Sequence, residues 1–461
     1  MAEPFLPLPR ALFKPRELEN LTLVDEMASL DPVLDSRVLN LLPNSDSPQI
    51  FTVCGRGARS TFRVLRHGLE TQEVVSSDLP GIPNAVWTTK LKEDGKRWLS
   101  QFSCKVADPL LDPFDSYIIL SFVNGTLVLS IGETIEEVQD TGFLSSAPTI
   151  AVQQIGTDAL LQVHPHGIRH VSTSRKVNEW RVPQGKTIVA ATTNKRQVVV
   201  ALSSAELVYF ELDLEGQLNE YQDRKAMGST VLALSIGEVP EGLQRTPFLV
   251  RFYVLFIDRQ LMASLQAVGC EDQTVRIISL DPETTLEPIS MQALTSPPSA
   301  ICIADMLDAG INKTHPTMFV NIGLQNGVLL RTVLDPVNGQ LTDTRTRYIR
   351  RVRDLCRCAH GVPCRFLGTR PIRLIRVAVQ KNPAILALSS RSWLNYTHQN
   401  RMHFTPLILD NLDYAWGFSA ELCPEGLIGI AGSTLRLVNF LHLSSLLFFR
   451  DENKGPYSLR A

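Results

Sequence analysis

The chain has 461 residues, of which 44% are apolar, and its 45 basic and 47 acidic residues leave a net charge of −2. A near-neutral chain has no global field that attracts a phosphate backbone, so its charge does not predict general nucleic-acid affinity. The length allows two or three average domains or one long all-β unit, and the apolar content is ample for a core.

Composition and the ends of the chain indicate a reduced compartment. The eight cysteines are scattered, which argues against a secreted disulfide framework. They are Cys54, Cys104, Cys270, Cys302, Cys356, Cys358, Cys364 and Cys423. The start, MAEPFLPLPR, has an acidic residue and three prolines where a signal peptide needs a basic start and an apolar helix. The apolar tracts from Phe248 and Leu437 are shorter than the roughly 20 residues that span a bilayer. We expect a soluble, intracellular protein.

Short runs of apolar and β-branched residues, typical of strands, recur along nearly the whole chain. In chain order they cover 21–24, 50–53, 62–65, 118–123, 126–131, 159–163, 188–191, 198–202, 207–212, 231–236, 274–280, 300–303, 318–322, 328–333, 372–379, 385–388 and 427–431. Turn residues separate these runs, and helical periodicity is nearly absent.

Several neighbouring runs are joined by turn signals that predict β-hairpins. Asn124-Gly125 and Asn326-Gly327 each lie between two strand-like runs, and both residue types tolerate the positive φ angles of a type I′ turn. A longer turn is predicted around Gly55 and Gly57, and another at 203–204. A chain made of hairpins predicts stacked antiparallel sheets.

The number of predicted strands favours a β-propeller. Roughly two dozen short strands would form six or seven four-stranded blades, whereas a single sandwich does not use so many strands. Radial closure also leaves few exposed sheet edges. A pair of sandwiches stays open as an alternative, because periodicity does not separate the two. We predict an all-β, WD-like β-propeller of about seven four-stranded blades.

Three stretches interrupt this pattern: residues 95–111, 250–266 and 349–366. They have neither clean alternation nor turn punctuation, so we interpret them as insertions. An insertion within a strand leaves ladder groups unpaired and is therefore a poor position for an evolved loop.

Outside these stretches, many segments resemble one known family. They are LVDEMASLDP from Leu23, CGRGARSTFRVLRHGLE from Cys54, LPGIPNAVWT from Leu79, SFVNGTLVLSIGETIEEV from Ser121, GIRHV from Gly167, VNEW from Val177, GQLNEY from Gly216, TVRIISLDP from Thr274, SMQAL from Ser290, NIGLQNGVLLRTVLDPVNGQLTDTRTRY from Asn321, SSRSWLNY from Ser389 and CPEG from Cys423. Together they resemble the large propeller proteins of the splicing factor 3b subunit 3 type. Relatives in that family are the large damaged-DNA-binding subunit and the large (A) subunit of the cleavage and polyadenylation specificity factor.

The resemblance implies that residues 13–437 form the second of three propellers, with an atypical extension at 1–12 and an atypical tail at 438–461. The family's sequence resumes on both sides of each inserted stretch, which indicates translated intron sequence.

It also implies a role. A non-catalytic scaffold in pre-mRNA splicing is expected, in the nucleus, within the branch-site-recognising ribonucleoprotein. In the family the first and third propellers hold the HEAT-repeat and small subunits of splicing factor 3b, and most of that clamp is missing here. A nucleic-acid-binding module, as in the damage-binding and polyadenylation relatives, is the alternative, and an enzyme is the third possibility. No membrane contact or cofactor is implied, and nucleic-acid contact would be indirect or weak.

Four groups of residues are candidate sites. Cys356, Cys358, His360 and Cys364 are ligand types that zinc prefers, but their spacing is uncommon and an adventitious thiol group is favoured. An arginine patch could neutralise RNA phosphates, although a solvated loop without an aromatic platform is favoured. It consists of Arg345, Arg347, Arg350, Arg351, Arg353, Arg357, Arg365, Arg370, Arg373 and Arg376, opposed by Asp354.

The other two groups also have a structural explanation. Gly55-x-Gly57-x-x-Ser60 lacks a third glycine and a following helix, so a hairpin turn is favoured over a dinucleotide loop. The imidazoles of His164, His166 and His170 could bind a metal, but the adjacent proline and glycine indicate a polar turn.

Four tryptophans are predicted to fill the space between blades, with each indole N–H reaching a backbone carbonyl. They are Trp87, Trp180, Trp393 and Trp416. No catalytic, cofactor or metal motif has credible spacing in the sequence, so we predict no catalytic, cofactor-binding or metal residues.

Overall fold

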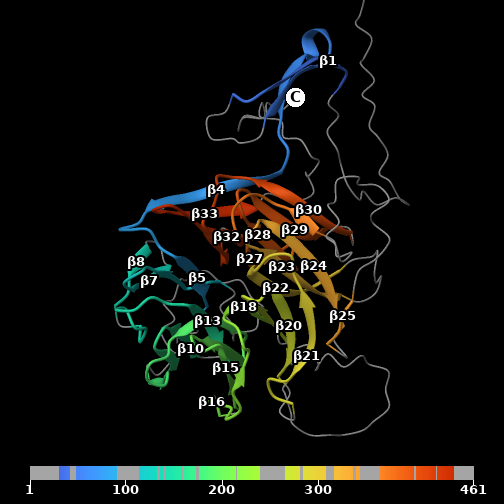
Figure 1. Cartoon of the computed structure of the whole chain (residues 1–461). Helices are drawn as coiled ribbons and strands as arrows, with labels where there is room; N and C mark the ends of the chain where they lie inside the picture. Colours follow the sequence, from blue (N-terminus) through green and yellow to red (C-terminus); the bar gives the residue numbers. More distant parts are fainter. Residues whose placement is uncertain are drawn as a thin grey trace, which may run out of the picture. The chain divides into compact units, whose positions relative to one another are not determined.

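A computed structural model gives the structure of the chain (Figure 1). It describes residues 31–41, 48–90, 114–131, 135–139, 141–156, 159–172, 176–213, 215–238, 265–280, 284–307, 316–335, 339–342, 364–398, 401–421 and 423–440. The chain divides into two compact units, the first formed by Met1–Leu41, Pro48–Arg66 and His442–Ala461 and the second by Leu42–Ser47 and His67–Leu441.

The first unit contains one small antiparallel sheet. Its strands are β1 (Val33–Leu39), β2 (Gln49–Cys54) and β3 (Thr61–Leu65), paired in that order, with the short 3-10 helix η1 (Gly57–Arg59) between β2 and β3. Every residue of β1 is exposed, while β2 alternates partly between buried and exposed positions. These strands pair only with one another, and the strands of the propeller begin with β4 at Leu69, later than the predicted start at residue 13.

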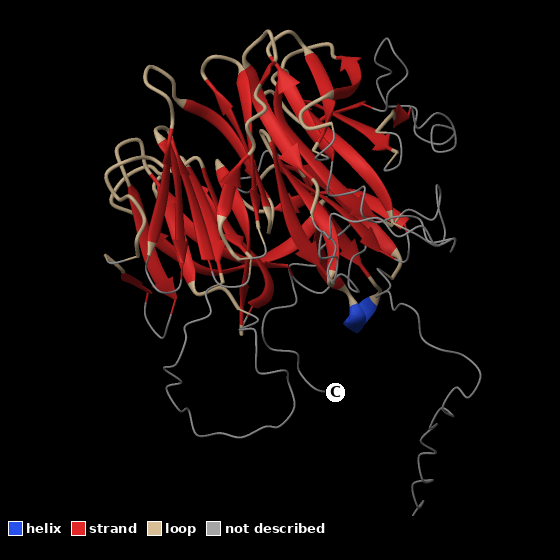
Figure 2. Ribbon diagram, turned by 90° about the horizontal axis from the view of Figure 1, so that it is seen from below, coloured by secondary structure: helices blue, strands red, loops and turns tan. Residues whose placement is uncertain are grey.

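The second unit is a seven-bladed β-propeller (Figure 2). Blade 1 contains β5 (Ala85–Thr89), β6 (Tyr117–Ser121), β7 (Thr126–Ile131) and β8 (Ile135–Glu137). Blade 2 contains β9 (Ala151–Ile155), β10 (Ala159–His164), β11 (Gly167–Ser172) and β12 (Val177–Arg181). Blade 3 contains β13 (Ile188–Thr193), β14 (Gln197–Leu202), β15 (Glu206–Leu212), β16 (Leu218–Glu220) and β17 (Lys225–Ala226).

The remaining blades follow in chain order. Blade 4 contains β18 (Val231–Ile236), β19 (Leu265–Cys270), β20 (Thr274–Ser279) and β21 (Pro288–Ala293). Blade 5 contains β22 (Pro298–Met306), β23 (Thr317–Leu324), β24 (Val328–Leu334), β25 (Leu341–Thr342) and β26 (Cys364–Phe366). Blade 6 contains β27 (Arg373–Val379), β28 (Asn382–Leu388), β29 (Ser392–His398) and β30 (Arg401–Ile408). Blade 7 contains β31 (Tyr414–Ala420), β32 (Cys423–Ala431), β33 (Thr434–Phe440) and β4 (Leu69–Asp78).

The first strand of each blade lies on the inside of the ring. These inner strands contact one another in the order β5, β9, β13, β18, β22, β27 and β31, and β31 contacts β5 again. The closed order excludes the pair of sandwiches. Blade 7 takes its outer strand from the start of the unit, because β4 pairs antiparallel with β33 and also touches β30 through a short parallel pairing.

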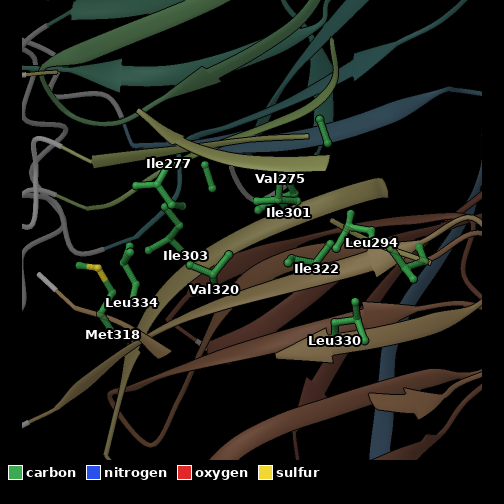
Figure 3. Packing of buried hydrophobic residues seen from close by; sticks show 13 residues of the cluster. Val275, Ile277, Leu294, Ile301, Ile303, Met318, Val320, Ile322, Leu330 and Leu334 are labelled. Atoms are coloured by element: carbon green, nitrogen blue, oxygen red, sulfur yellow. The ribbon is translucent and has the colours of Figure 1, made fainter. Parts of the chain in front are cut away.

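Apolar side chains fill the space between adjacent blades. Between blades 4 and 5, Val275 and Ile277 from β20 pack with Ile301, Ile322 and further aliphatic residues into one buried cluster (Figure 3). Such clusters arise because each blade is buried on both faces, which explains why strands such as β14 are buried at every position.

The structure confirms the predicted hairpins but corrects their turn type. Phe122 N donates to Gly125 O (2.7 Å) and Gly327 N donates to Leu324 O (3.1 Å), so both Asn-Gly pairs lie at turns. Neither residue of the first pair has a positive φ, and in the second pair only Gly327 does, at 78°. A type I′ turn would need positive φ at both central positions. A Cβ on Gly125 would lie 2.7 Å from Ser145 O, so close approach, and not turn geometry, explains this glycine.

Three predicted boundaries also differ from the strands. The last two residues of the 250–266 stretch, Leu265 and Gln266, are the start of β19, and the last three residues of the 349–366 stretch are β26. Residues 438–440 of the predicted tail complete β33. These residues satisfy ladder hydrogen bonds, which composition alone did not reveal. Residues 95–111 and the extension at 1–12 lie outside the described residues.

Candidate interaction surface

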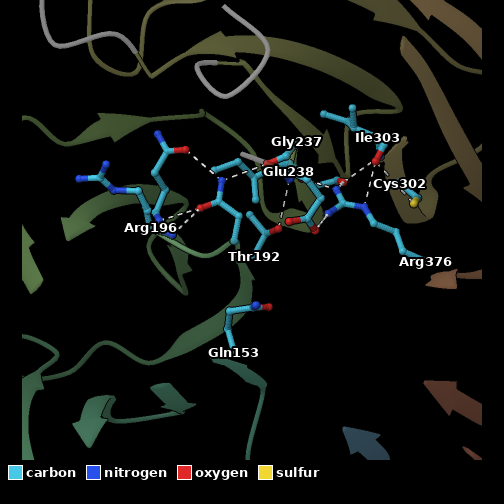
Figure 4. A network of polar contacts seen from close by, with 12 residues as sticks. Gln153, Thr192, Arg196, Gly237, Glu238, Cys302, Ile303 and Arg376 are labelled. Carbon is cyan, nitrogen blue, oxygen red and sulfur yellow. Dashed lines mark hydrogen bonds and ion pairs between the residues drawn. The ribbon is translucent and has the colours of Figure 1, made fainter. Parts of the chain in front are cut away.

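One arginine joins the inner strands of three successive blades (Figure 4). Arg376 on β27 donates from Nε to the carbonyl oxygen of Ile303 on β22, at 2.9 Å. Its other guanidinium nitrogens reach the carbonyl oxygen of Ile236 at the end of β18 and the carboxylate of Glu238. The Arg376 side chain is 28% exposed and that of Glu238 is 56% exposed. This arginine therefore serves the packing of blades 4, 5 and 6.

The network continues from blade 4 to blade 3. Asn194 Nδ2 donates to Gly237 O (3.0 Å), and Ile236 N donates to Thr192 Oγ1 (3.2 Å). Asn194 is fully buried and also bonds Gln197 through its side chain. Polar groups on the inner strands are thus used to join blades, which leaves them poorly suited to bind a small molecule.

A second set of polar contacts joins blade 7 to blade 1. Asp115 Oδ2 accepts hydrogen bonds from the backbone nitrogen of Ser419 (2.7 Å) and from its hydroxyl (3.3 Å). Thr88 Oγ1 donates to Gly417 O (2.8 Å). Burial raises the pKa of the Asp115 carboxyl above its ordinary value of 3.8, and the hydrogen bond from Ser419 opposes that shift.

The predicted arginine patch is only partly within the described residues. Six of its ten arginines lie outside them: Arg345, Arg347, Arg350, Arg351, Arg353 and Arg357. The other four are Arg365, Arg370, Arg373 and Arg376. Arg370 pairs with Asp413 at 3.6 Å, and the Arg373 guanidinium lies 5.3 Å from the centre of the Tyr414 ring. Each of the four has a partner within the fold, and Arg370, whose side chain is 60% exposed, and Arg373 also lie at the surface.

Arg365 has an aromatic partner pair that sequence reasoning missed. Its guanidinium lies 4.7 Å from the ring centre of Phe404 and 5.9 Å from that of Trp393, and the two rings stack at 5.3 Å. Burial lowers the pKa of Arg365. The rings come from β29 and β30, far along the chain from β26, so no local spacing could have indicated them. The contact is a cation–π interaction within the fold.

The three histidines do not form a metal site. His164 on β10 pairs with Gly167, and His170 on β11 pairs with Leu161, so their side chains lie on opposite faces of the sheet. His164 Nε2 lies 3.8 Å from Glu179 Oε1, and burial lowers the pKa of both His164 and His170. His166 lies in the turn between the two strands. Among the residues that the structure describes, no group of three or more His, Cys, Asp or Glu could hold a metal ion.

The remaining sequence candidates have structural positions where they are described. Gly55 and Gly57 have φ of 86° and 63° in the β2–β3 connection, which confirms the hairpin interpretation. Of the cysteine and histidine cluster only Cys364 is described, as the first residue of β26. Cys356, Cys358 and His360 lie outside the described residues, so the zinc question stays a prediction.

The tryptophans pack between blades as predicted, but their N–H partners differ. Trp87 on β5 lies 6.1 Å from Tyr414 of blade 7 by ring centres, and Trp416 joins the same apolar cluster. Trp180 Nε1 donates to the Glu220 carboxylate at 2.6 Å, where a carbonyl was expected. The buried Nε1 of Trp393 has no hydrogen-bond partner among the described atoms. Within the described part of the chain, no helix is long and apolar enough to cross a membrane.

The chain is similar in sequence to pre-mRNA-splicing factors. The sequence is 60% identical over 440 residues to the pre-mRNA-splicing factor RSE1 of Mycosarcoma maydis, covering 94% of this chain and 32% of the relative. It is 49% identical over 434 residues to splicing factor 3B subunit 3 of Danio rerio, covering 92% of this chain and 31% of the relative. The corresponding protein of Drosophila melanogaster is 48% identical over 441 residues, which cover 92% of this chain and 32% of the relative.

The chain thus spans about a third of the length of the curated relatives it matches. A family match covers residues 71–362 and 363–440, which includes all seven blades. The start of this match at residue 71 agrees with the position of β4 and excludes the β1–β3 sheet. The chain therefore belongs to the family of the RSE1/DDB1/CPSF1 second beta-propeller.

Proposed function

We propose that this chain is a non-catalytic scaffold that acts in pre-mRNA splicing within a nuclear complex of the splicing factor 3b type. Its similarity to RSE1 and splicing factor 3B subunit 3 over more than nine-tenths of its length is the observation that carries the proposal. A rigid ring whose loops converge on two faces suits a scaffold, because loop residues can vary while the blades supply stability.

The engagement of the described arginines supports this proposal over nucleic-acid binding. Arg365, Arg370, Arg373 and Arg376 each contact a partner within the propeller, so a phosphate would compete with these contacts. We expect the purified chain to bind single-stranded RNA no more tightly than a near-neutral control protein of similar size. A binding constant that weakens steeply with salt would contradict this, because such a slope reports released counterions.

Splicing itself is tested in a chimera. The whole chain replaces the matching third of RSE1 in Mycosarcoma maydis, and the level of unspliced transcripts is measured. We expect splicing at the parental level. Accumulation of unspliced transcripts, with the chimera present at the parental amount, would contradict the proposal, and the unaltered gene carried through the same replacement is the control.

The isolated chain is proposed to bind the HEAT-repeat subunit of splicing factor 3b only weakly. The family resemblance assigns that contact to the first and third propellers, whereas the chain matches the second. We expect the chain to be lost from the immobilised HEAT-repeat subunit during washing, while full-length splicing factor 3B subunit 3 is retained. Stoichiometric capture of the chain alone would contradict this division of roles.

A further inference from the structure

The outer edge of blade 5 is built from two strands that are distant in sequence. In β25, Thr342 lies opposite Val333, and in β26, Cys364 lies opposite Leu330, so both strands pair with the same edge of β24. Only two residues of β24 separate these two pairings, whereas the chain between Thr342 and Cys364 contains residues 343–363. A connection of about two residues would join β25 to β26 as one outer strand, but the chain has residues 343–363 at this point.

The sequence before this interruption repeats the chemistry of β26. Thr346-Arg347-Tyr348 immediately precedes the 349–366 stretch, and β26 reads Cys364-Arg365-Phe366. If residues 349–366 are removed, Tyr348 precedes Leu367 directly and takes the place of Phe366. Arg347 then takes the place of Arg365 over the rings of Trp393 and Phe404. The family match also breaks between residues 362 and 363, inside the same stretch.

The shorter connection would fit the ladder. With Thr346 opposite Leu330, three residues (343–345) would face the two residues between Leu330 and Val333. One extra residue on an antiparallel edge is a β-bulge, which bends the strand without breaking the pairing. Blade 3 has a comparable outer edge, because β16 and β17 share the edge of β15 and four residues (221–224) face the two residues of β15 between their pairings.

Blade 4 carries an independent sign of the same kind. Gln266 on β19 is fully buried, and neither atom of its amide has a hydrogen-bond partner among the described residues. Its neighbours across the ladder are Ile236 and Ile278, which are also fully buried. A buried amide without partners is costly, so this position is suited to an aliphatic side chain. If residues 250–266 are removed, Leu249 takes the position of Gln266 and Phe248 that of Leu265.

From these two observations we propose that a chain without residues 250–266 and 349–366 forms the same blades 4 and 5, and that this shorter chain is the product of a fully spliced transcript. In it Leu249 replaces Gln266 between two isoleucines, and one continuous outer strand replaces β25 and β26. The inference is independent of the proposed function, because it concerns how the ladders of two blades are completed.

The blade 4 position is tested by two matched substitutions in the full chain. Gln266→Leu is expected to raise the midpoint of thermal unfolding by roughly 2–4 °C. Gln162→Leu is the control, because Gln162 is equally buried but bonds Leu144 N, Leu144 O and Thr149 Oγ1. That variant is expected to lower the midpoint. A midpoint for Gln266→Leu that is unchanged or lower would overturn the assignment of Leu249 to this position.

The blade 5 register is tested by moving one arginine. Arg365→Ala in the full chain is expected to lower the unfolding midpoint through loss of the contacts with Phe404 and Trp393. In the chain without 349–366, Arg347→Ala is expected to lower the midpoint by the same shift. A shorter chain that fails to fold, or one in which Arg347→Ala is silent, would overturn the register. Sequencing of transcripts is expected to find a form without the codons for both stretches, and its absence would overturn the origin proposed for the shorter chain.

Discussion

The Arg376 network offers a test of how the inner ring is stabilised. Replacing Arg376 by alanine removes charge-assisted hydrogen bonds to the carbonyl oxygens of Ile236 and Ile303 and an ion pair with Glu238. Each hydrogen bond from a charged donor contributes about 1.5–3 kcal/mol, and the ion pair contributes less than about 1 kcal/mol because Glu238 is more than half exposed. The two hydrogen bonds dominate, so we expect Arg376→Ala to lower the free energy of unfolding by about 3–6 kcal/mol.

The assay is equilibrium unfolding in urea followed by tryptophan fluorescence, with all variants compared at the same slope. Glu238→Gln is the matched variant, because it removes only the ion pair, and we expect it to cost less than about 1 kcal/mol. Arg376→Lys should fall between the two, since an ammonium group cannot reach both carbonyls in the fork geometry of a guanidinium. Equal losses in Arg376→Ala and Glu238→Gln would refute this reasoning, because they would place the whole stabilisation in the ion pair.

Three further predictions concern turns and ring closure. Gly327→Ala should lower the free energy of unfolding by about 2–4 kcal/mol, because a Cβ there would overlap Gly368 O. Gly216 has a similar φ of 77° but lies in open space, so Gly216→Ala should lower it by only about 1–2 kcal/mol. Equal losses in the two variants would contradict the steric argument. Gln380 and Lys381 have φ of 52° and 60°, and their backbone N–H groups donate to the Glu425 carboxylate. Gln380→Asn with Lys381→Gly should raise the urea midpoint because Asn and Gly tolerate positive φ, and Glu425→Gln should lower it because the hydrogen bonds lose their charged acceptor. The reverse order of the two midpoints would contradict the turn assignment. Burial raises the pKa of the Asp115 carboxyl in the folded state, so its contribution to stability is complete below about pH 3.8 and is lost as the pH rises through the folded pKa. Asp115→Asn does not titrate and should therefore gain stability relative to the parent between about pH 4 and 7. Parallel pH profiles of the two proteins would show that the carboxyl is not buried as described.

The sequence predicted those features of the fold that depend on residues close together in the chain. The strand-like runs and turn residues were enough to predict a propeller of about seven blades, since the blades, apart from strand β4 of blade 7, are series of hairpins between neighbours in sequence. The tryptophans were placed correctly between blades because a large ring next to a strand is seldom accommodated elsewhere. The type I′ turn at Asn124-Gly125 was wrong, because the approach of Ser145, from outside the hairpin, explains the glycine.

Contacts between distant segments could not be read in the same way. Nothing in the sequence from Leu69 to Asp78 indicates that it pairs with Thr434–Phe440. Each segment has an ordinary strand sequence that would suit many other partners. The roles of Arg365 and Arg376 were also hidden, since their partners come from other strands and, for Arg376, from other blades. The arginine cluster in the sequence favoured a solvated loop over a basic surface, whereas the fold gives each of the four described arginines its own partner.

The pairing of β4 with β33 also fixes where the chain enters and leaves the ring. Thr71 lies opposite Phe440, so the first and last strands of the propeller run side by side in one blade. A domain with adjacent entry and exit points can be inserted into a longer polypeptide without separating the segments on either side. A polypeptide that continues on both sides of this ring would therefore enter and leave it through the same blade.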